Sequence, residues 1–326
     1  MWTIIGHEWA VALLRRSLAE DRVGHAYLIT GPPQTGKTTL ARTFAQALNC
    51  THTAADERPC SVCRACRLVS NDSHPDVRII RPDGAYLKID QVRALQHQVA
   101  LSPLEGRWKV YILRQMECAT TEAANALLKT LEEPPSHTIL LLTASEPEAL
   151  LPTIVSRCQP IPLRPLGRQA VERALVARQQ VVPEQAALLA SLSGGRLGWA
   201  IETARNPARL ARRAQQLDEL QALLAQGRAE RFIHADKLSQ DPTALRETFN
   251  LWLTWWRDLL LLSHGSTVAL THQDRSDQLR QQANRWSPQE IRQAVEATRQ
   301  AILALDSHVN PRLVAEALML RLPRLA

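Results

Sequence analysis

Short apolar runs alternate with amphipathic stretches along the first half of the chain. The runs predict buried strands, and apolar positions spaced every three or four residues between them predict helices. Strands that alternate with helices imply a parallel sheet covered by helices on both faces. The predicted strands span residues 26–30, 77–80, 110–113 and 139–143, and the predicted helices span residues 38–48 and about 121–131.

A proline-rich segment at residues 160–165 (PIPLRP) follows the alternating half, and we expect it to be a break beyond the sheet. After this segment the pattern is entirely helical. The chain is therefore expected to comprise an α/β domain over residues 1–165, a small helical domain over 166–206 and an all-helical domain over 207–326.

Two helices of the last domain have clear start signals. Ser287 and Glu290 form a capping box with proline at the first helical position, and Asn310-Pro311 opens the final helix in the same way. An aromatic stripe is typical of the core of a helix bundle, which we favour over a platform for stacking bases. Its members are Leu245, Phe249, Trp252, Trp256 and Leu259.

Composition narrows the class of protein. The 326 residues are 45% hydrophobic and 22% charged, which is typical of a globular protein, and the formal net charge is +7. That charge is compatible with a nucleic-acid or acidic partner but is weak evidence for one. The first ten residues lack the pattern of a signal peptide, and the apolar stretch at 251–262 is too short to cross a bilayer. A cytoplasmic protein without membrane contact is expected.

Four of the six cysteines, Cys50, Cys60, Cys63 and Cys66, fall within one short segment. Two short spacings after one longer loop are typical of a tetrahedral Zn²⁺ site with four thiolates, which would be structural because it leaves no open position. The alternatives are four free thiols grouped by chance, or a redox pair. Cys118 and Cys158 stand apart and are expected to be core thiols.

Residues 31–38 match the pattern G-x-x-x-x-G-K-[ST] between a predicted strand and a predicted helix. Gly31 and Gly36 would let the backbone wrap around a phosphate, Lys37 would reach the β- and γ-phosphates, and Thr38, followed by Thr39, would bring a hydroxyl to Mg²⁺. ATP or ADP, with Mg²⁺, is the expected ligand. The alternative is a degenerate loop that binds nothing.

Hydrolysis of ATP needs more than this loop, because such enzymes usually carry two carboxylates after a later strand. The strand at 110–113 is followed instead by Arg114 and Gln115. Glu117 lies too late in the sequence to replace them unless the turn is rearranged. Nucleotide binding without turnover is therefore expected.

Several segments together resemble the bacterial clamp-loader branch of the AAA+ proteins. They are residues 25–28 and 31–50, the four cysteines, residues 89–93 and 106–110, residues 123–135 (AANALLKTLEEPP) and Ser156-Arg157-Cys158. They cover about half of the chain. The resemblance implies an AAA+ P-loop domain with an inserted zinc module, followed by a small helical lid and an all-α collar for oligomerisation.

Within that family, Arg114-Gln115 and the chain length resemble the non-hydrolysing delta-prime branch of the DNA polymerase III clamp loader rather than the gamma and tau motor subunits. The resemblance implies a five-membered ring with gamma/tau and delta subunits that opens a sliding clamp and places it on primed DNA during replication. Arg157 would complete the ATP site of a neighbouring subunit. A role for Arg196 at a γ-phosphate in the lid stays open.

Two other functions are carried as alternatives. One is a working ATPase of the same family, like gamma or tau, and the other is a stand-alone zinc protein that binds DNA. Intrinsic polymerase activity is not expected, because the paired carboxylates of a nucleotidyl transferase are not recognisable, although the chain would be a component of a polymerase holoenzyme.

Overall fold

The computed structural model describes residue 2, residues 4–307 and residues 309–324. The chain forms two compact units. The first comprises Met1–Ala170 together with Gly195–Gly198, and the second comprises Val171–Gly194 and Trp199–Ala326. The expected separation of a lid from a collar near residue 206 stays a prediction.

A parallel sheet of five strands forms the centre of the first unit, in the order β2-β3-β4-β1-β5. The three inner strands are buried along their whole length, because their side chains are apolar on both faces. The predicted strands and the α/β class are confirmed. The strands are β1 (Ala26–Thr30), β2 (Val77–Ile80), β3 (Lys109–Leu113), β4 (Thr138–Ala144) and β5 (Gln159–Pro162).

The expected break at residues 160–165 is wrong in its first part, because β5 pairs in parallel with β1 there. Leu28 lies opposite Pro160 and Thr30 lies opposite Pro162. Proline lacks the N–H that a central strand needs, but an edge strand has one side without a neighbour, and β5 is at the edge of the sheet. The prolines therefore mark an edge strand rather than the end of the sheet.

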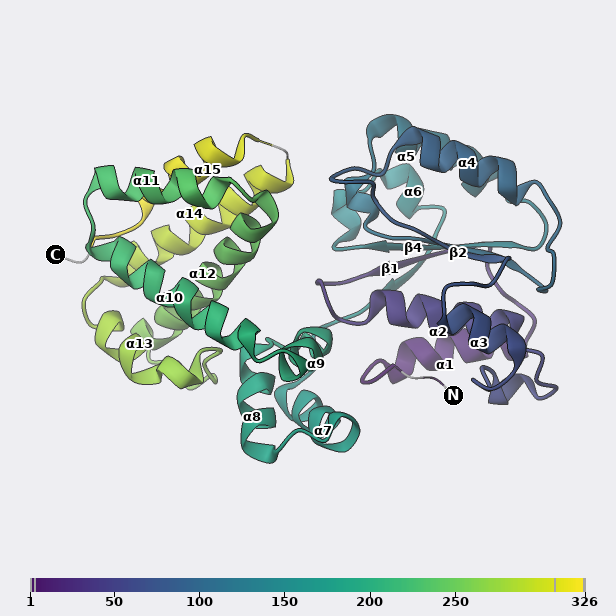
Figure 1. Cartoon of the computed structure of the whole chain (residues 1–326), viewed down its shortest axis with the longest axis horizontal. Helices are drawn as coiled ribbons and strands as arrows, with labels where there is room; N and C mark the ends of the chain where they lie inside the picture. Colours follow the sequence, from purple (N-terminus) through teal and green to yellow (C-terminus); the bar gives the residue numbers. More distant parts are fainter. Residues whose placement is uncertain (1, 3, 308, 325–326) are drawn as a thin grey trace. The chain divides into compact units, whose positions relative to one another are not determined.

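Helices cover both faces of this sheet (Figure 1). One layer packs on the face that carries Leu28, Tyr111 and Leu140, and the other packs on the face that carries Tyr27 and Ile112. The first layer contains α4 (Ile89–Val99), α5 (Thr121–Glu132) and α6 (Pro152–Val155), and the second contains α1 (Glu8–Ala19), α2 (Lys37–Asn49) and α3 (Arg64–Ser70).

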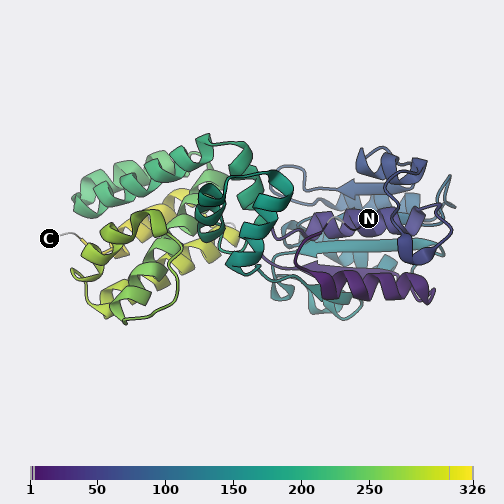
Figure 2. The ribbon, with the colours of Figure 1, turned by 90° about the horizontal axis from the view of Figure 1, so that it is seen from below.

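The second unit is built from helices around a core of its own. Helices α12 and α14 pack along one another, as do α11 and α15, and Figures 1 and 2 show both pairs side by side. The helices are α7 (Arg168–Gln179), α8 (Pro183–Leu192), α9 (Leu197–Arg205), α10 (Ala208–Ala225), α11 (Arg228–Ser239), α12 (Pro242–Ser263), α13 (Ser276–Ala283), α14 (Pro288–Asp306) and α15 (Pro311–Arg321).

The aromatic stripe of α12 is core, as predicted: Phe249, Trp252 and Trp256 are fully buried. The predicted helix starts are confirmed as well. The Ser287 hydroxyl accepts from the backbone N–H of Glu290, and the Asn310 side chain accepts from the N–H groups at the start of α15. Over the residues described, none of these helices combines the length and apolarity needed to cross a membrane.

Candidate functional site

The loop between β1 and α2 carries two glycines in backbone conformations that other residues rarely adopt. Gly31 and Gly36 adopt φ angles of +140° and +101°, which side chains disfavour. A Cβ on Gly31 would lie 2.2 Å from the carbonyl oxygen of Leu163, just after β5, so this position has no room for a side chain. The residue just after the proline-containing edge strand β5 therefore restricts the first position of the loop to glycine.

Lys37 is the first residue of α2, and its Nζ donates to the carbonyl oxygens of Gly31 and Pro32, the latter at 2.8 Å. Burial lowers the pKa of Lys37 to about 8; Glu117 opposes this shift and Arg114 adds to it. Thr38 is half-buried and Thr39 is exposed in the first turn of the helix. The loop, the ammonium group and the helix N-terminus thus meet at one place, as the motif predicts.

The segment after β3 carries cations and amides where hydrolytic enzymes carry carboxylates. The backbone of Arg114 continues the sheet with a 2.9 Å hydrogen bond from its N–H to the Ile80 carbonyl. Gln115 follows in the left-handed region (φ 55°), and its N–H donates to the Thr143 hydroxyl at 3.2 Å. Neither side chain supplies a carboxylate, so these two positions do not fit Mg²⁺.

The turn after β3 brings one carboxylate, that of Glu117, toward the loop between β1 and α2. The left-handed Gln115 leads into a short 3-10 helix, η2 (Met116–Cys118), which brings Glu117 within electrostatic range of Lys37. One Glu117 oxygen accepts from the Ser145 hydroxyl at 2.6 Å. The other is buried and, within the described part of the chain, has no hydrogen-bond partner. Sequence spacing alone did not reveal this carboxylate beside the loop.

A second residue beside the loop was missed because it precedes β1. His7 is buried at the start of α1, and its Nε2 lies 3.0 Å from the Thr35 carbonyl oxygen. Burial lowers the pKa of His7, against smaller opposing effects of Thr35 and Glu8. The segment Gly195–Gly198, which includes the start of α9, reaches the loop too, since the N–H of Gly198 donates to the Gln34 carbonyl at 2.9 Å. Arg196 lies in this segment of the first unit.

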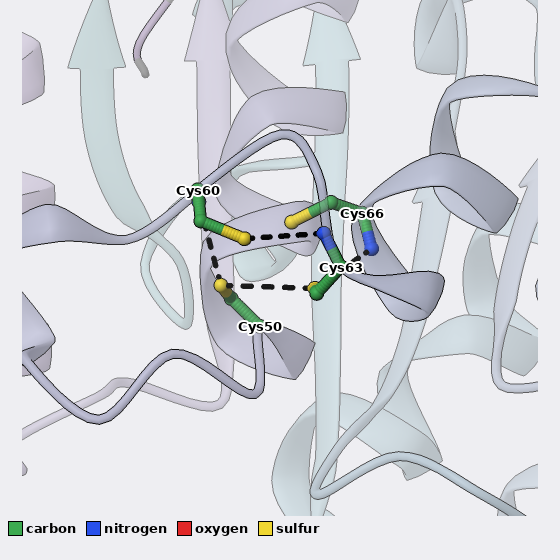
Figure 3. A group of neighbouring side chains, drawn as sticks. All are labelled: Cys50, Cys60, Cys63 and Cys66. Atoms are coloured by element: carbon green, nitrogen blue, oxygen red, sulfur yellow. Dashed lines mark hydrogen bonds between the residues drawn. The ribbon is translucent and has the colours of Figure 1, made fainter.

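The four clustered cysteines converge on one point at the far end of α2 (Figure 3). Their sulfur atoms all lie within 4.8 Å of one another, close to the spacing of about 3.8 Å that Zn–S bonds of 2.3 Å give in a tetrahedron. Cys50 follows the last residue of α2, and Cys63 caps the N-terminus of α3. The residues fit a four-thiolate metal site.

Backbone N–H groups already point at these sulfur atoms. Those of Cys60, Cys63 and Cys66 donate to the Sγ atoms of Cys50, Cys60 and Cys63 at 3.3–3.4 Å. Burial would raise the pKa of the Cys63 thiol, but hydrogen bonds led by the N–H groups of Cys66 and Thr51 lower it to about 6. Burial raises the pKa of Cys66. A bound cation would favour the thiolate at every position.

Arg157 lies after α6 with about a third of its side chain exposed. Its Nη2 forms an ion pair with Glu132 at the end of α5 at 2.7 Å, and its Nη1 donates to the Thr153 carbonyl at 3.0 Å. The neighbouring Cys158 is buried, and burial raises its pKa to about 12, as expected for a core thiol. These contacts hold Arg157 at the surface in a defined orientation.

Two family models match most of the chain. The family described as "DNA polymerase III, delta subunit" matches residues 6–167, and the family described as "DNA polymerase III, delta subunit, C terminal" matches residues 207–324. A solved structure of a DNA polymerase III gamma subunit-related protein from Thermotoga maritima is 18% identical, with a TM-score of 0.48, over 95% of this chain and 97% of that one.

Two relatives from Bacillus subtilis differ in how much of their length matches this chain. The DNA polymerase III subunit tau is 38% identical, but the match covers 59% of this chain and 35% of the tau chain. The DNA polymerase III subunit delta' is 34% identical over 95% of this chain and 94% of its own. With a relative matched over nearly all of both sequences, the chain belongs to the delta' subunit family of bacterial DNA polymerase III.

Proposed function

We propose that the chain is a clamp-loader subunit that binds ATP or ADP without hydrolysing it and acts on the ATP site of a neighbouring subunit. The observation that carries the proposal is the pairing of an intact phosphate-binding loop with Arg114 and Gln115 after β3. The loop supplies the donors and the cation for phosphate, whereas the strand end supplies neither carboxylate for hydrolysis.

Arg157 is the group through which the chain would act on its neighbour. A guanidinium suits this role because its planar fork pairs with phosphate oxygens as charge develops on them. Its pair with Glu132 is at the surface, with 35% and 50% of the two side chains exposed. A surface pair of this kind is worth about 0.2–1 kcal/mol, so a phosphate can displace Glu132 at little cost.

The cysteine cluster would hold one structural Zn²⁺ through Cys50, Cys60, Cys63 and Cys66. Gln46 of α2 donates to the Cys66 carbonyl at 3.0 Å and to the Ser70 hydroxyl at 2.7 Å, so α3 is fastened to the helix that begins at Lys37. The bound metal would link Cys50 to the segment of Cys60, Cys63 and Cys66 and would stabilise the C-terminal end of α2.

Assembly with the clamp-loader subunits gives the test of the whole proposal. The chain, co-expressed with gamma/tau-type and delta-type subunits of its own organism, should co-purify as one complex. That complex should hydrolyse ATP in response to sliding clamp and primed DNA and should load the clamp. A complex that assembles and works equally well without this chain would refute the proposal.

A working ATPase is the second candidate, and the position of Glu117 is the observation that favours it. This carboxylate is near Lys37 and hydrogen-bonded to Ser145, so it is the one acid the turn after β3 brings toward the loop among the residues described. ATP turnover by the isolated chain that Glu117→Gln removes, with nucleotide affinity unchanged, would establish this candidate over the first.

A further inference from the structure

A pocket of about 400 Å³ opens beside β2 in the first unit, away from the residues of the phosphate-binding loop. Helix α2 contributes Arg42 to it, and the edge strand β2 and the turn after it contribute Arg78 and Arg81. Val69 and Ile112 are among the apolar residues that line it. Six of its eleven lining residues are polar or charged, and its volume is within the range of small-ligand sites.

The charges around this pocket do not balance. Asp72 is the one acid among its lining residues, all of which are described, and three arginines share it, which leaves a net charge of +2. Arg42 pairs with Asp72 at 2.8 Å, and Arg81 lies 3.8 Å from the same carboxylate. His74, also in the lining, does not compensate, because burial lowers its pKa against the opposing effects of Asp76 and Glu105.

Two further observations concern the donors and the charge at this pocket. The Nε of Arg42 is buried and has no acceptor in the described part of the chain. Buried donors without a partner are rare, and each calls for an explanation. The neighbouring Arg114 feels the same cluster: burial lowers its pKa, and Arg81 and Arg42 lower it further. The pocket therefore has donors and positive potential ready for an anion.

We propose that this pocket, formed by Arg42, Arg78 and Arg81, binds a phosphate group, supplied either by a free nucleotide or by a nucleic-acid backbone. Guanidinium groups match phosphate oxygens in a bidentate geometry, and the attractions of several guanidiniums to one anion add together. The pocket is a separate site from the loop at residues 31–39, so the proposal does not depend on nucleotide binding at that loop.

The test uses the full chain carrying Lys37→Ala, which weakens the phosphate-binding loop. Into this background go two matched pairs of substitutions. Arg78→Gln with Arg81→Gln removes two exposed arginines of the pocket. Arg16→Gln with Arg22→Gln removes two exposed arginines that share Glu20, as Arg42 and Arg81 share Asp72. Both pairs lower the net charge of the chain by two. A difference between their effects on binding therefore comes from the pocket and not from the net charge.

Two probes distinguish the source of the phosphate. Inorganic pyrophosphate, titrated by calorimetry, should bind one equivalent, and the pocket pair should weaken it at least tenfold while the control pair does not. The second probe is a 12-nucleotide single strand, followed by fluorescence anisotropy across a salt series. If the source is a nucleic-acid backbone, the pocket pair should reduce the salt slope by about 1.4, since each lost phosphate contact on a single strand removes about 0.7. Either result supports the proposal and identifies the source. Failure of both probes to bind, or equal effects of the two pairs, would overturn it.

Discussion

The ends of two strands in the same sheet, β1 and β3, have different chemistry. After β1, the loop keeps the glycines, Lys37 and Thr38 that phosphate binding needs. After β3, two strands away in the sheet, Arg114 and Gln115 stand where metal binding and water activation need carboxylates. Holding a nucleotide and hydrolysing it use different residues, so a chain can keep the first ability without the second.

This difference between the two strand ends bears on where the chain would contribute to ATP hydrolysis. If the chain cannot hydrolyse ATP at its own site, it can contribute to hydrolysis only at the ATP site of a neighbouring subunit. Arg157 is the residue that the proposed function assigns to that role.

Arg157→Ala should have the largest effect, and it should appear only in the assembled complex. Loss of an arginine that stabilises the transition state costs on the order of 10³-fold at the affected ATP site. Clamp loading on primed DNA should fail, although total ATP turnover should fall only in part because other sites keep their own arginines. Arg157→Lys should rescue little. Arg16→Ala, which also removes a surface ion pair, is the control. Normal loading by the Arg157→Ala complex would show that Arg157 is a surface charge only.

Cys63→Ser should lose the metal and destabilise the first unit. Removing a ligand of a structural zinc site is among the few single changes expected to cost on the order of 4 kcal/mol or more in unfolding free energy. Metal analysis should give one zinc per wild-type chain and much less in the variant, and the melting temperature should drop. Cys118→Ser, a thiol outside the cluster, should keep its zinc. A wild-type chain purified without chelator and free of zinc would contradict the assignment.

Lys37→Ala should weaken ATP binding about 10- to 100-fold, the loss expected for a hydrogen-bonded charge facing phosphate. Calorimetry on the isolated chain measures this. Zinc content and melting temperature should hardly change, because Lys37 lies at the opposite end of α2 from the cysteines. Equal ATP affinity in the two proteins would mean that the loop binds no nucleotide.

The smallest effect concerns pH. Burial lowers the pKa of Lys37 to about 8, so the side chain is an ammonium below that pH and becomes neutral above it. ATP affinity should therefore fall by up to about tenfold between pH 7 and pH 9, because bound phosphate raises the pKa of Lys37 and the neutral amine loses that attraction. Lys37→Ala should remove this pH dependence. Any change that remains in the variant measures the titration of ATP itself. If the wild-type chain and Lys37→Ala show the same dependence of ATP affinity on pH, a group other than Lys37 causes it.

The sequence predicted those parts of the fold whose signal is local. The inner strands are continuous apolar runs, the capping residues stand at fixed spacings, and the cysteine spacing indicated a metal site before any geometry was known. The residues of the loop at 31–38, whose binding of phosphate stays a prediction, are likewise contiguous in the chain. Each of these features depends on residues close together in the sequence.

The features that were missed depend on the sheet. Proline suggested a break at β5, because the sequence does not show which strand lies at the edge. Glu117 was judged too distant, because a left-handed backbone at a glutamine, here Gln115, has no sequence signal. The pocket arginines come from α2 and from β2 with its following turn, and only the packed fold brings them to one acid.

ATP turnover by the isolated, zinc-loaded wild-type chain tests the central claim most directly. Binding should be measured on the same sample by calorimetry, with Lys37→Ala as the baseline for both quantities. We predict that the wild-type chain binds ATP more tightly than Lys37→Ala does, while releasing phosphate no faster than that variant. Phosphate release that is clearly faster in the wild-type chain, and that Lys37→Ala abolishes, would contradict the claim that this subunit binds nucleotide without hydrolysing it.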